Sequence, residues 1–438
     1  MKAKLLQPGL LMLIMAVTLS SCIKDQCERM VTYVQLTPIY QTKDEIRAGS
    51  LTNETARELC NPGQIYYYNQ HIFINERGEG VHVINNIDPE NPTNIAFLNI
   101  PGNDDIAIKN GILYANNYMD LLAIDITNFG NASLISRTED IFTPQWEDIN
   151  TGEVLIEWAS EEITETMDCA NYATLYNNGG GFFRFNNSVD FSFASADVSI
   201  ESAVSANQAV GGIGTGGSMA RFTIVSDYLY ALEDWEMDVI SLVDPKQPSF
   251  LSSVNMGWGI ETIFPLGDKL FIGSQTGMFI YDNSNPANPT FLSAFEHARA
   301  CDPVFVDGDI AYVTLRDGTP CTGASNQMDL VDISNIESPV LLETFPMDHP
   351  HGLSIRGDRL FLCEGENGLK VYDISDPRAL DENLLAERKD FEAIDVISLP
   401  NSRQTAIVIG RDGFYQFEYD EATKGLKLLS KIEVVEKP

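Results

Sequence analysis

Residues 368–377 read GLKVYDISDP, and this segment decides the fold. Apolar and polar residues alternate up to Asp373, which is the period of a β-strand, and Pro377 then marks a turn. A second apolar strand follows the segment, and a hairpin with a short polar turn precedes it. Related segments recur at 78–92, 119–127, 236–248, 276–289 and 327–339. The chain therefore repeats a four-stranded unit.

The hairpin turns define the period of this repeat. They lie at Asn69, Asn110, Asp227, Gly267, Asp307, Gly357 and Asn401, so the intervals are 41, 117, 40, 40, 50 and 44 residues. A four-stranded unit of about 40–45 residues is typical of a propeller blade. Seven turns therefore predict an all-β, seven-bladed β-propeller. The long interval predicts an insertion of about 75 residues, 143–217, between blades two and three.

The third strands of these units resemble the motif of the LVIVD-repeat proteins, a family of exported bacterial β-propellers. The resemblance extends from about Ile65 to Val435, and 217–232 looks like a blade opening of Bacteroidetes-type lipoprotein members. It implies a fold and no reaction, so it identifies no catalytic residue. The matching residues are Leu330-Val331-Asp332, Leu369 to Asp373, Ile280-Tyr281-Asp282 and Ala123-Ile124-Asp125, whereas Asn85, Ser241 and Glu418 replace the motif Asp.

The motif Asp is predicted to cap backbone N–H groups of the turn that follows it, as short polar side chains commonly do. Calcium binding is the alternative role. Capping is favoured because each motif Asp has only one acid within reach. A calcium ion needs six or more oxygen ligands.

Residues 1–21 have the pattern of an export signal, with Lys2 and Lys4 ahead of an apolar stretch too short for a membrane span. The segment Leu19-Ser20-Ser21-Cys22 resembles the bacterial lipobox, which implies that Cys22 is acylated and anchors the protein to a membrane. Ile23 is not the Asp that retains enterobacterial lipoproteins at the inner membrane. We therefore expect an extracytoplasmic protein of the outer membrane.

Residues 22–60 are expected to form a leader, followed by the propeller at 61–438. Within the leader, residues 30–41 have the composition of a strand. We expect this strand to join the last blade, because a propeller must close its ring between the first blade and the last.

Six cysteines follow Cys22, and exported proteins form disulfides. Cys27 and Cys60 flank the leader, and Cys301 and Cys321 are both expected near one face, so these are the candidate pairs. Free buried thiols are the alternative. The absence of any CxxC spacing disfavours a zinc ribbon or a redox motif.

The insertion is rich in Asn, Gly and Ser. Its glycine runs, at 177–187 and 211–217, do not lead into Lys-Ser or Lys-Thr, so we expect flexible, positive-φ backbone and no phosphate loop. The insertion is expected to be either a small β-hairpin over the propeller or an aromatic binding surface, and residues 145–215 are expected to be removable. The aromatic residues are Phe182, Phe183, Phe185, Phe191 and Phe193.

In a four-stranded blade, the connections after the second and fourth strands open on the same face. The insertion follows a fourth strand, and the extra residues near 316–326 in the fifth blade follow a second strand. Both segments are therefore expected to lie on that face. The residues before each first strand ring the mouth of the central channel on the same face. The candidate binding residues there are Asp105, Trp258, Glu261, Asp302, His349, His351 and Glu392.

Three of these residues, Glu261, Asp302 and His351, are candidate metal ligands. A propeller brings such residues together around its axis, and oxygen ligands suit calcium or another divalent cation. The alternative is that polar side chains fill a wet channel mouth without holding an ion.

The charge excludes one class of partner. Asp and Glu number 63 and Lys and Arg number 28, so the formal charge is −35, which disfavours nucleic-acid binding. No GxSxG, no HExxH and no GxGxxG after a strand is present.

Two functions are therefore weighed. The favoured one is a non-catalytic binding module for a protein or glycan partner, with Trp146, Trp158, Trp235 and Trp258 as candidate contact residues. The alternative is a divalent-metal-dependent hydrolase or lyase at the channel mouth, which rests on analogy between folds.

Overall fold

The computed structural model describes residues 28–144, 146–168, 183–185, 213–217, 219–296, 303–317, 326–399 and 404–436. The chain divides into two compact units. The first comprises residues 1–40 and 155–195, and the second comprises residues 41–154 and 196–438. The helical elements within the described ranges are α2 (Lys43–Ala48) and the short 3-10 helix η1 (Pro377–Glu382).

The second unit is a seven-bladed propeller, as the turn spacing predicts. The first blade contains β3 (Pro62–Tyr68), β4 (His71–Glu76), β5 (Gly80–Asn85) and β6 (Thr93–Asn99), with β2 (Thr52–Glu54) added outside β6. The second contains β7 (Ile106–Lys109), β8 (Ile112–Asn117), β9 (Asp120–Asp125) and β10 (Ser133–Thr138). The third contains β14 (Phe222–Val225), β15 (Tyr228–Leu232), β16 (Glu236–Ser241) and β17 (Ser249–Asn255).

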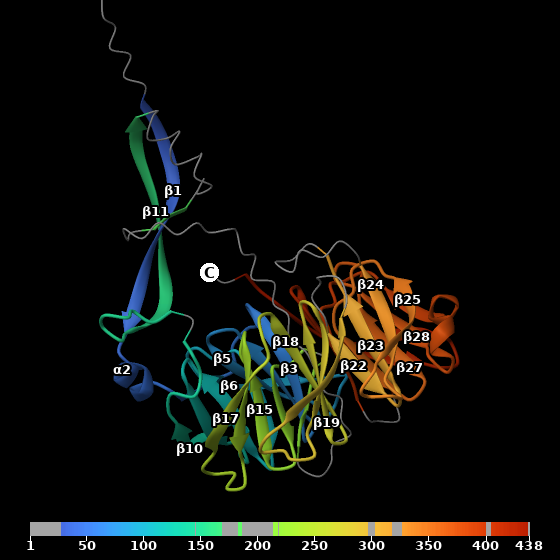
Figure 1. Cartoon of the computed structure of the whole chain (residues 1–438). Coiled ribbons are helices and arrows are strands. Elements are labelled where there is room, and N and C mark those ends of the chain that lie inside the picture. The colour runs from blue at the N-terminus through green and yellow to red at the C-terminus, as the bar shows by residue number, and fades with distance from the viewer. Residues whose placement is uncertain are drawn as a thin grey trace, which may run out of the picture. The chain divides into compact units, whose positions relative to one another are not determined.

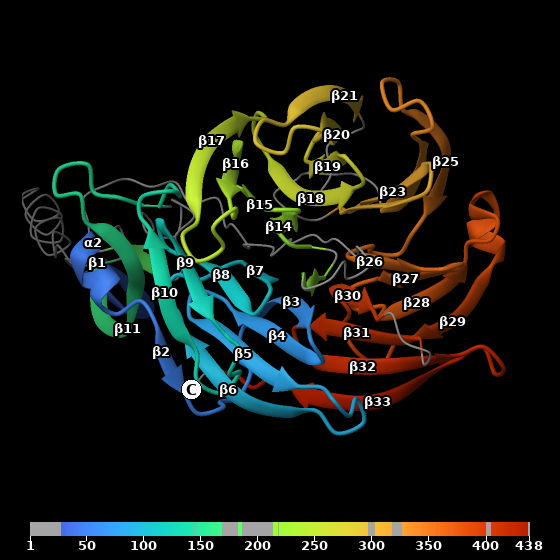
Figure 2. The same ribbon diagram turned by 90° about the horizontal axis from the view of Figure 1, so that it is seen from below.

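The other four blades follow without a long interruption. The fourth contains β18 (Ile260–Leu266), β19 (Lys269–Ser274), β20 (Gly277–Asp282) and β21 (Thr290–Glu296). The fifth contains β22 (Val304–Asp307), β23 (Ile310–Leu315), β24 (Gln327–Asp332) and β25 (Val340–Pro346). The sixth contains β26 (Leu353–Arg356), β27 (Arg359–Cys363), β28 (Leu369–Asp373) and β29 (Leu384–Arg388), and the seventh contains β30 (Asp395–Ser398), β31 (Thr405–Gly410), β32 (Gly413–Asp420) and β33 (Gly425–Glu433). Within this unit, the first strand of each blade lies nearest the centre (Figure 2).

The motif Asp caps the following turn, as predicted. The Oδ1 atoms of Asp332 and Asp373 accept hydrogen bonds from the backbone N–H two residues later, at 2.8 and 2.9 Å. The substitutes Asn85 and Ser241 accept the same bond at 3.0 and 3.3 Å. In the seventh blade β32 is longer, and Asp420 rather than the aligned Glu418 accepts it, at 2.8 Å.

The capped turns also join neighbouring blades. Tyr114 in the second blade donates its hydroxyl to Pro245 O in the third, and Tyr230 donates to Pro286 O in the fourth, both at 2.8 Å. Ser430 in the last blade donates to Pro89 O in the first, also at 2.8 Å. The proline-containing turn of one blade thus accepts a hydrogen bond from the blade before it.

The prediction that residues 30–41 add a strand to the last blade is wrong. That blade obtains its four strands from β30 to β33, so no strand position is left for the leader. The ring closes instead by packing between the first and last blades and by a single parallel bridge between Leu59 and Val434. Asn86 and Gln416 exchange two side-chain hydrogen bonds across the same boundary, at 2.9 and 2.8 Å.

The leader strand belongs to the first unit. There β1 (Glu28–Gln41) lies between β11 (Val154–Asp168) and β12 (Phe183–Phe185), and Figure 1 shows β1 and β11 side by side. Val34 pairs with Phe183 in parallel register, and Tyr33 donates its hydroxyl to Glu165 at 2.9 Å. The insertion is therefore not a self-contained hairpin, because its strands pair with the leader. Phe182, Phe191 and Phe193 lie outside the described residues.

The last part of the insertion belongs to the propeller instead. Strand β13 (Thr215–Gly216) pairs with the innermost strand β3, and Gly214 donates its N–H to Ile108 in β7 at 2.9 Å. The segment 213–217 thus lies along the inner strands of the first two blades. The expectation that 145–215 can be removed freely is not supported, since residues 213–215 contribute to this contact.

Two glycines of segment 213–217 are explained by close packing against neighbouring side chains and not by positive φ. A Cβ atom at Gly214 would lie 2.3 Å from the Tyr66 ring, and one at Gly217 would lie 2.0 Å from Asp395 Oδ2. Neither glycine has positive φ, so the expectation of positive-φ backbone is wrong for these two positions.

Several predictions fall outside the described residues: the export signal, Cys22, Cys27, Cys301, Cys321 and Asp302. Among the described residues Cys60 has no disulfide partner, and its predicted partner Cys27 lies outside them. The two disulfide pairings therefore stay predictions. Over the described ranges, no helix is long and apolar enough to cross a membrane.

Candidate functional site

The predicted site residues lie on the propeller face where the first strands begin, here called the channel face. Asp105 directly precedes β7, His351 lies two residues before β26, and Glu392 lies three residues before β30. Trp258 lies two residues before β18, and Glu261 is the second residue of that strand. The connections that follow the second strand of each blade open on the same face. The channel face therefore combines residues from most blades of the ring.

Asp105 is buried at the mouth of the channel, with 3% of its surface exposed. Its Oδ2 accepts hydrogen bonds from Gln64 Nε2 at 2.8 Å and from the Arg221 backbone N–H at 2.7 Å. Burial raises the pKa of Asp105 to about 7, although both hydrogen bonds act in the opposite direction. This carboxyl group therefore changes charge near neutral pH and is a poor fixed anionic ligand for a cation.

Three asparagines support the start of β7, and none of them is among the predicted binding residues. Asn75 Nδ2 donates to Asn103 Oδ1 at 2.7 Å, and Asn103 Nδ2 donates to Asn116 Oδ1 at 3.0 Å. Asn116 Oδ1 also accepts the backbone N–H groups of Asp104 and Asp105, at 2.9 and 3.0 Å. These side chains come from two blades, so no local sequence pattern could reveal the network.

His349 and His351 form a neutral pair beside Arg316. Arg316 Nη1 donates to His351 Nδ1, and His351 Nε2 lies 3.3 Å from His349 Nδ1. A guanidinium group has no acceptor, so the Nδ1 atom of His351 carries no proton. Burial and the charge of Arg316 hold the pKa of His351 well below its usual range. A metal ion at His351 Nδ1 would have to displace the guanidinium group.

Arginine is the residue type that the sequence analysis missed at this face. Arg77 and Arg411 lie in the connections after the second strands of the first and seventh blades, and Arg221 lies just before β14. The charge of Arg411 lowers the pKa of Arg77 and of Arg316, in each case after the larger effect of burial. The charges of these guanidinium groups thus interact around the channel mouth.

The Arg77 side chain folds over the start of β3. A Cβ atom at Gly63 would lie 3.1 Å from Arg77 Nε, so the missing side chain leaves room for the guanidinium group. Arg77 Nη1 is buried and has no hydrogen-bond partner, and Arg221 Nε is in the same state. Buried polar atoms in native proteins are nearly always paired, so these two N–H groups point to an absent ligand or solvent.

Glu392 and Glu261 contribute acids to this face. Glu392 is half-buried, accepts the backbone N–H of Arg411 at 3.2 Å and lies 3.8 Å from the Arg411 guanidinium group. Burial raises the pKa of Glu392. Glu261 is half-buried in β18.

The predicted metal set is not assembled in the described part of the chain. Those residues contain no group of three or more His, Cys, Asp or Glu that could hold a metal ion. Asp302, the third predicted ligand, lies outside them. A divalent cation at Glu261, Asp302 and His351 therefore stays a prediction.

Trp235 and Trp258 form an exposed aromatic pair on the channel face. Their ring centroids are 6.5 Å apart at an interplanar angle of 60°, and the residues are 56% and 48% exposed. Trp235 comes from the connection between β15 and β16, and Trp258 comes from the connection between the third and fourth blades. The predicted role of both residues as surface aromatics of this face fits their positions.

The backbone around the two tryptophans is fixed. Met256 donates its N–H to Trp235 O at 2.9 Å, and Gly259 donates to Asp234 O at 3.1 Å. Gly257 and Gly259 flank Trp258 with φ of 89° and 82°, a region that favours glycine. These hydrogen bonds link the two loops that carry the rings, and such ordering before binding lowers the entropic cost of binding.

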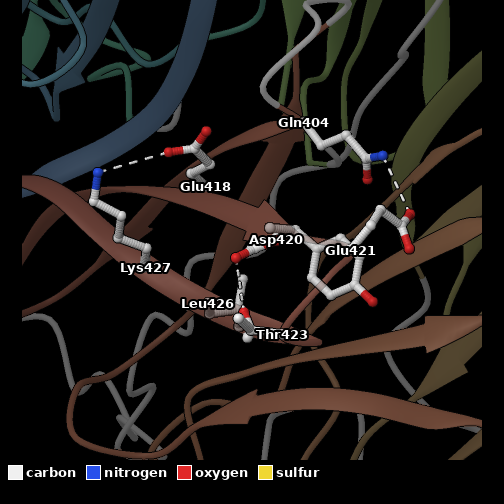
Figure 3. A pocket seen from close by; sticks show the side chains of 9 residues that line it. Gln404, Glu418, Asp420, Glu421, Thr423, Leu426 and Lys427 are labelled. Carbon is white, nitrogen blue, oxygen red and sulfur yellow. Dashed lines mark hydrogen bonds and ion pairs between the residues drawn. The ribbon is translucent and has the colours of Figure 1, made fainter.

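A second candidate site is a pocket of about 480 Å³ on the seventh blade, at the turn between β32 and β33 (Figure 3). Its acids are engaged in structural contacts: Glu421 pairs with Arg359 at 2.9 Å, and Asp420 accepts from Thr423 Oγ1 at 2.9 Å. Lys427 lies 3.8 Å from Glu418. The turn between third and fourth strands opens on the face opposite to the channel face, so this pocket is separate from the predicted site.

Comparison with known families identifies the repeat. The LVIVD repeat family model matches residues 266–296, 298–346 and 350–384. These ranges cover most of the fourth to sixth blades, and the chain therefore contains LVIVD repeats in a seven-bladed propeller. No curated protein sequence matches this chain.

Solved structures share the fold at low sequence identity. The periplasmic gluconolactonase PpgL of Pseudomonas aeruginosa is similar with a TM-score of 0.52 and 12% identity, over 87% of this chain and 97% of that chain. Hsv2 of Kluyveromyces lactis is similar with a TM-score of 0.46 and 10% identity, over 86% of this chain and 100% of that chain. Such identities show the propeller fold alone.

Proposed function

We propose that the protein is a non-catalytic binding module whose channel face binds a glycan, and that a lipid at Cys22 anchors it outside the cytoplasm at the outer membrane. The observation that carries the binding proposal is the exposed pair of Trp235 and Trp258, whose rings pack against each other. Exposed aromatic rings are costly to leave in water and are typical of recognition surfaces. The two rings meet at 60°, which leaves an angular platform for a flat, partly apolar ring.

The size of this platform favours a sugar over a protein. A stable protein interface buries about 800 Å² on each partner and needs a larger apolar centre than two rings. A sugar ring presents C–H groups to an aromatic face and hydroxyl groups to its surroundings. Asp234 and Glu236 flank Trp235 and can accept hydrogen bonds from such hydroxyl groups.

The test is binding of the purified full chain to a printed glycan array. We expect selective signals that fall at least tenfold in the Trp235→Ala and Trp258→Ala variants. Trp146→Ala is the matched control, since Trp146 is 44% exposed but is not part of the pair. Array signals that persist in both variants, or that fall equally in the control, would contradict the proposal. A chain that binds no glycan but captures one defined protein through this face would replace the glycan with a protein partner.

The alternative from the sequence, a divalent-metal-dependent hydrolase or lyase, is tested on the same preparation. Metal analysis of the purified chain would favour it if one divalent ion per chain were lost in Glu261→Gln.

A further inference from the structure

We propose that the channel mouth holds a second site, separate from the tryptophan pair, that binds a small anion bearing a carboxylate or phosphate group through Arg77, Arg221 and Arg411. This proposal does not depend on glycan binding at Trp235 and Trp258. It concerns positive charge gathered in a protein whose formal charge is −35.

The first support is the state of the guanidinium groups. Arg77 Nη1 and Arg221 Nε are buried and have no hydrogen-bond partner. A buried N–H without a partner costs about 1–3 kcal/mol, so an acceptor at these positions would recover free energy. Arg411 is 70% exposed, and the ion pair that it forms with Glu392 in the described part of the chain spans 3.8 Å, a long distance for such a contact.

The second support is the arrangement of the charges. Asp104 interacts electrostatically with Arg77 and Arg221, and Arg411 interacts with Arg77, so Arg77 is the central member of the cluster. Within the described ranges, no ion pair of 4 Å or less joins Asp104 to either arginine. Arg221 has a direct acidic partner in Asp234, at 3.1 Å, but that residue is largely exposed. Among the described residues, Arg77 thus forms no ion pair of 4 Å or less, although Asp104 and Glu76 act on its charge from farther away.

The third support is that Asp105, His349 and His351, which lie beside these arginines, carry little negative charge. Burial shifts the pKa of Asp105 to about 7, which leaves part of it neutral near physiological pH. His349 and His351 have lowered pKa values, so both imidazoles are neutral there. The charged groups that act on Arg77, Arg221 and Arg411 at the mouth thus include the acids Asp104 and Glu392.

The chemistry of the ligand follows from the donors. Guanidinium groups present N–H donors in a fixed fork that matches the paired oxygen atoms of a carboxylate or a phosphate. The rest of the surface repels anions, so a small ligand that reaches the mouth is favoured over an extended polyanion. The charge of Asp104 acts on both Arg77 and Arg221, and it should weaken anion binding by like-charge repulsion.

The experiment measures the affinity of the full chain by isothermal titration calorimetry for inorganic phosphate and, separately, for succinate at constant ionic strength. We expect saturable binding of at least one probe. Affinity should fall at least tenfold in Arg77→Gln and several-fold in Arg411→Gln. The side chain of Arg411 is exposed, so its substitution should not disturb the fold. The two probes distinguish a phosphate ligand from a carboxylate ligand.

Two variants sharpen the test. Asp104→Asn should raise the affinity several-fold, because it removes a negative charge next to the anion. Arg388→Gln is the matched control, since Arg388 pairs with Asp390 at 2.6 Å on the sixth blade, away from the mouth. The proposal is overturned if neither probe binds, if the control loses as much affinity as Arg77→Gln, or if Asp104→Asn weakens binding. The last result would instead indicate a cation site.

Discussion

At the scale of single residues, the burial of Asp105 has a consequence that can be measured. It lies under the channel mouth with a pKa of about 7, raised by burial, whereas an Asp in an unfolded chain titrates near pH 4. Between these values the folded state holds a proton that the unfolded state has lost. The free energy of unfolding therefore falls as pH rises from about 4 to 7, and this contribution is constant above that range.

We predict that Asp105→Asn stabilises the protein at pH 8 by about 1–3 kcal/mol and has little effect at pH 4 to 5. Asn keeps an oxygen acceptor for the Arg221 N–H without carrying a buried charge. Urea unfolding at several pH values measures this, with exposed Asp381→Asn as the control. The same pH dependence in wild type and Asp105→Asn would show that another group titrates. Asp238, whose pKa burial also raises to about 7, is the first candidate for that role.

The residue scale also shows what sequence could and could not predict about the site. Asp105, His351, Glu392 and Trp258 were identified because each stands just before a first strand, a position that can be read from the repeat. Arg77 and Arg411 were not predicted, because acids far outnumber bases in this chain and the acids were the expected ligands. Their importance depends on which neighbours lack a partner, and a sequence does not contain that information.

At the scale of elements, the segment 213–217 decides how the insertion returns to the propeller. It runs along β3 and β7, and its glycines allow an approach that a side chain would prevent. Gly217 lies against Asp395 at the start of β30. This short element therefore contacts the first, second and seventh blades.

Gly217→Ala is expected to destabilise the propeller by about 1–3 kcal/mol, because the added methyl group overlaps Asp395. Gly49→Ala is the control, since a Cβ atom at Gly49 has no neighbour within 4 Å. Thermal unfolding followed by circular dichroism measures both variants. An unchanged melting temperature for Gly217→Ala would mean that the segment yields easily and is not part of the channel packing.

At the scale of the whole molecule, the two units have largely separate contacts. We predict that a protein lacking residues 1–40 and 155–195, with a short linker in place of the second segment, keeps a folded propeller. Its melting temperature should stay within a few degrees of the full chain, because each blade retains its four strands. A deletion extended through residue 217 should instead lower the melting temperature clearly. Equal behaviour of the two deletions would contradict the role of 213–217.

Closure of the ring is the second property at this scale. Leu59 is fully buried between the first and last blades, and its carbonyl oxygen accepts the Val435 N–H at 2.8 Å. Leu59→Ala should lower the free energy of unfolding by about 2–5 kcal/mol, the usual range for a buried leucine. Leu428→Ala, at a 39% exposed position of the last blade, should cost much less. Chemical denaturation compares them, and equal losses would argue against closure through Leu59.

The sequence by itself determined the seven blades, the capped turns and the position of the insertion. These features depend on strand period, turn residues and spacing, which are local properties that each blade repeats. Tertiary structure decided the partner of the leader strand, the way the ring closes and the charge of the channel mouth. A strand of 14 residues can pair with any compatible edge, and it pairs with the 15-residue β11 rather than with a complete blade. The arginines of the mouth come from blades far apart in the sequence, and their interaction exists because the ring brings them to one axis.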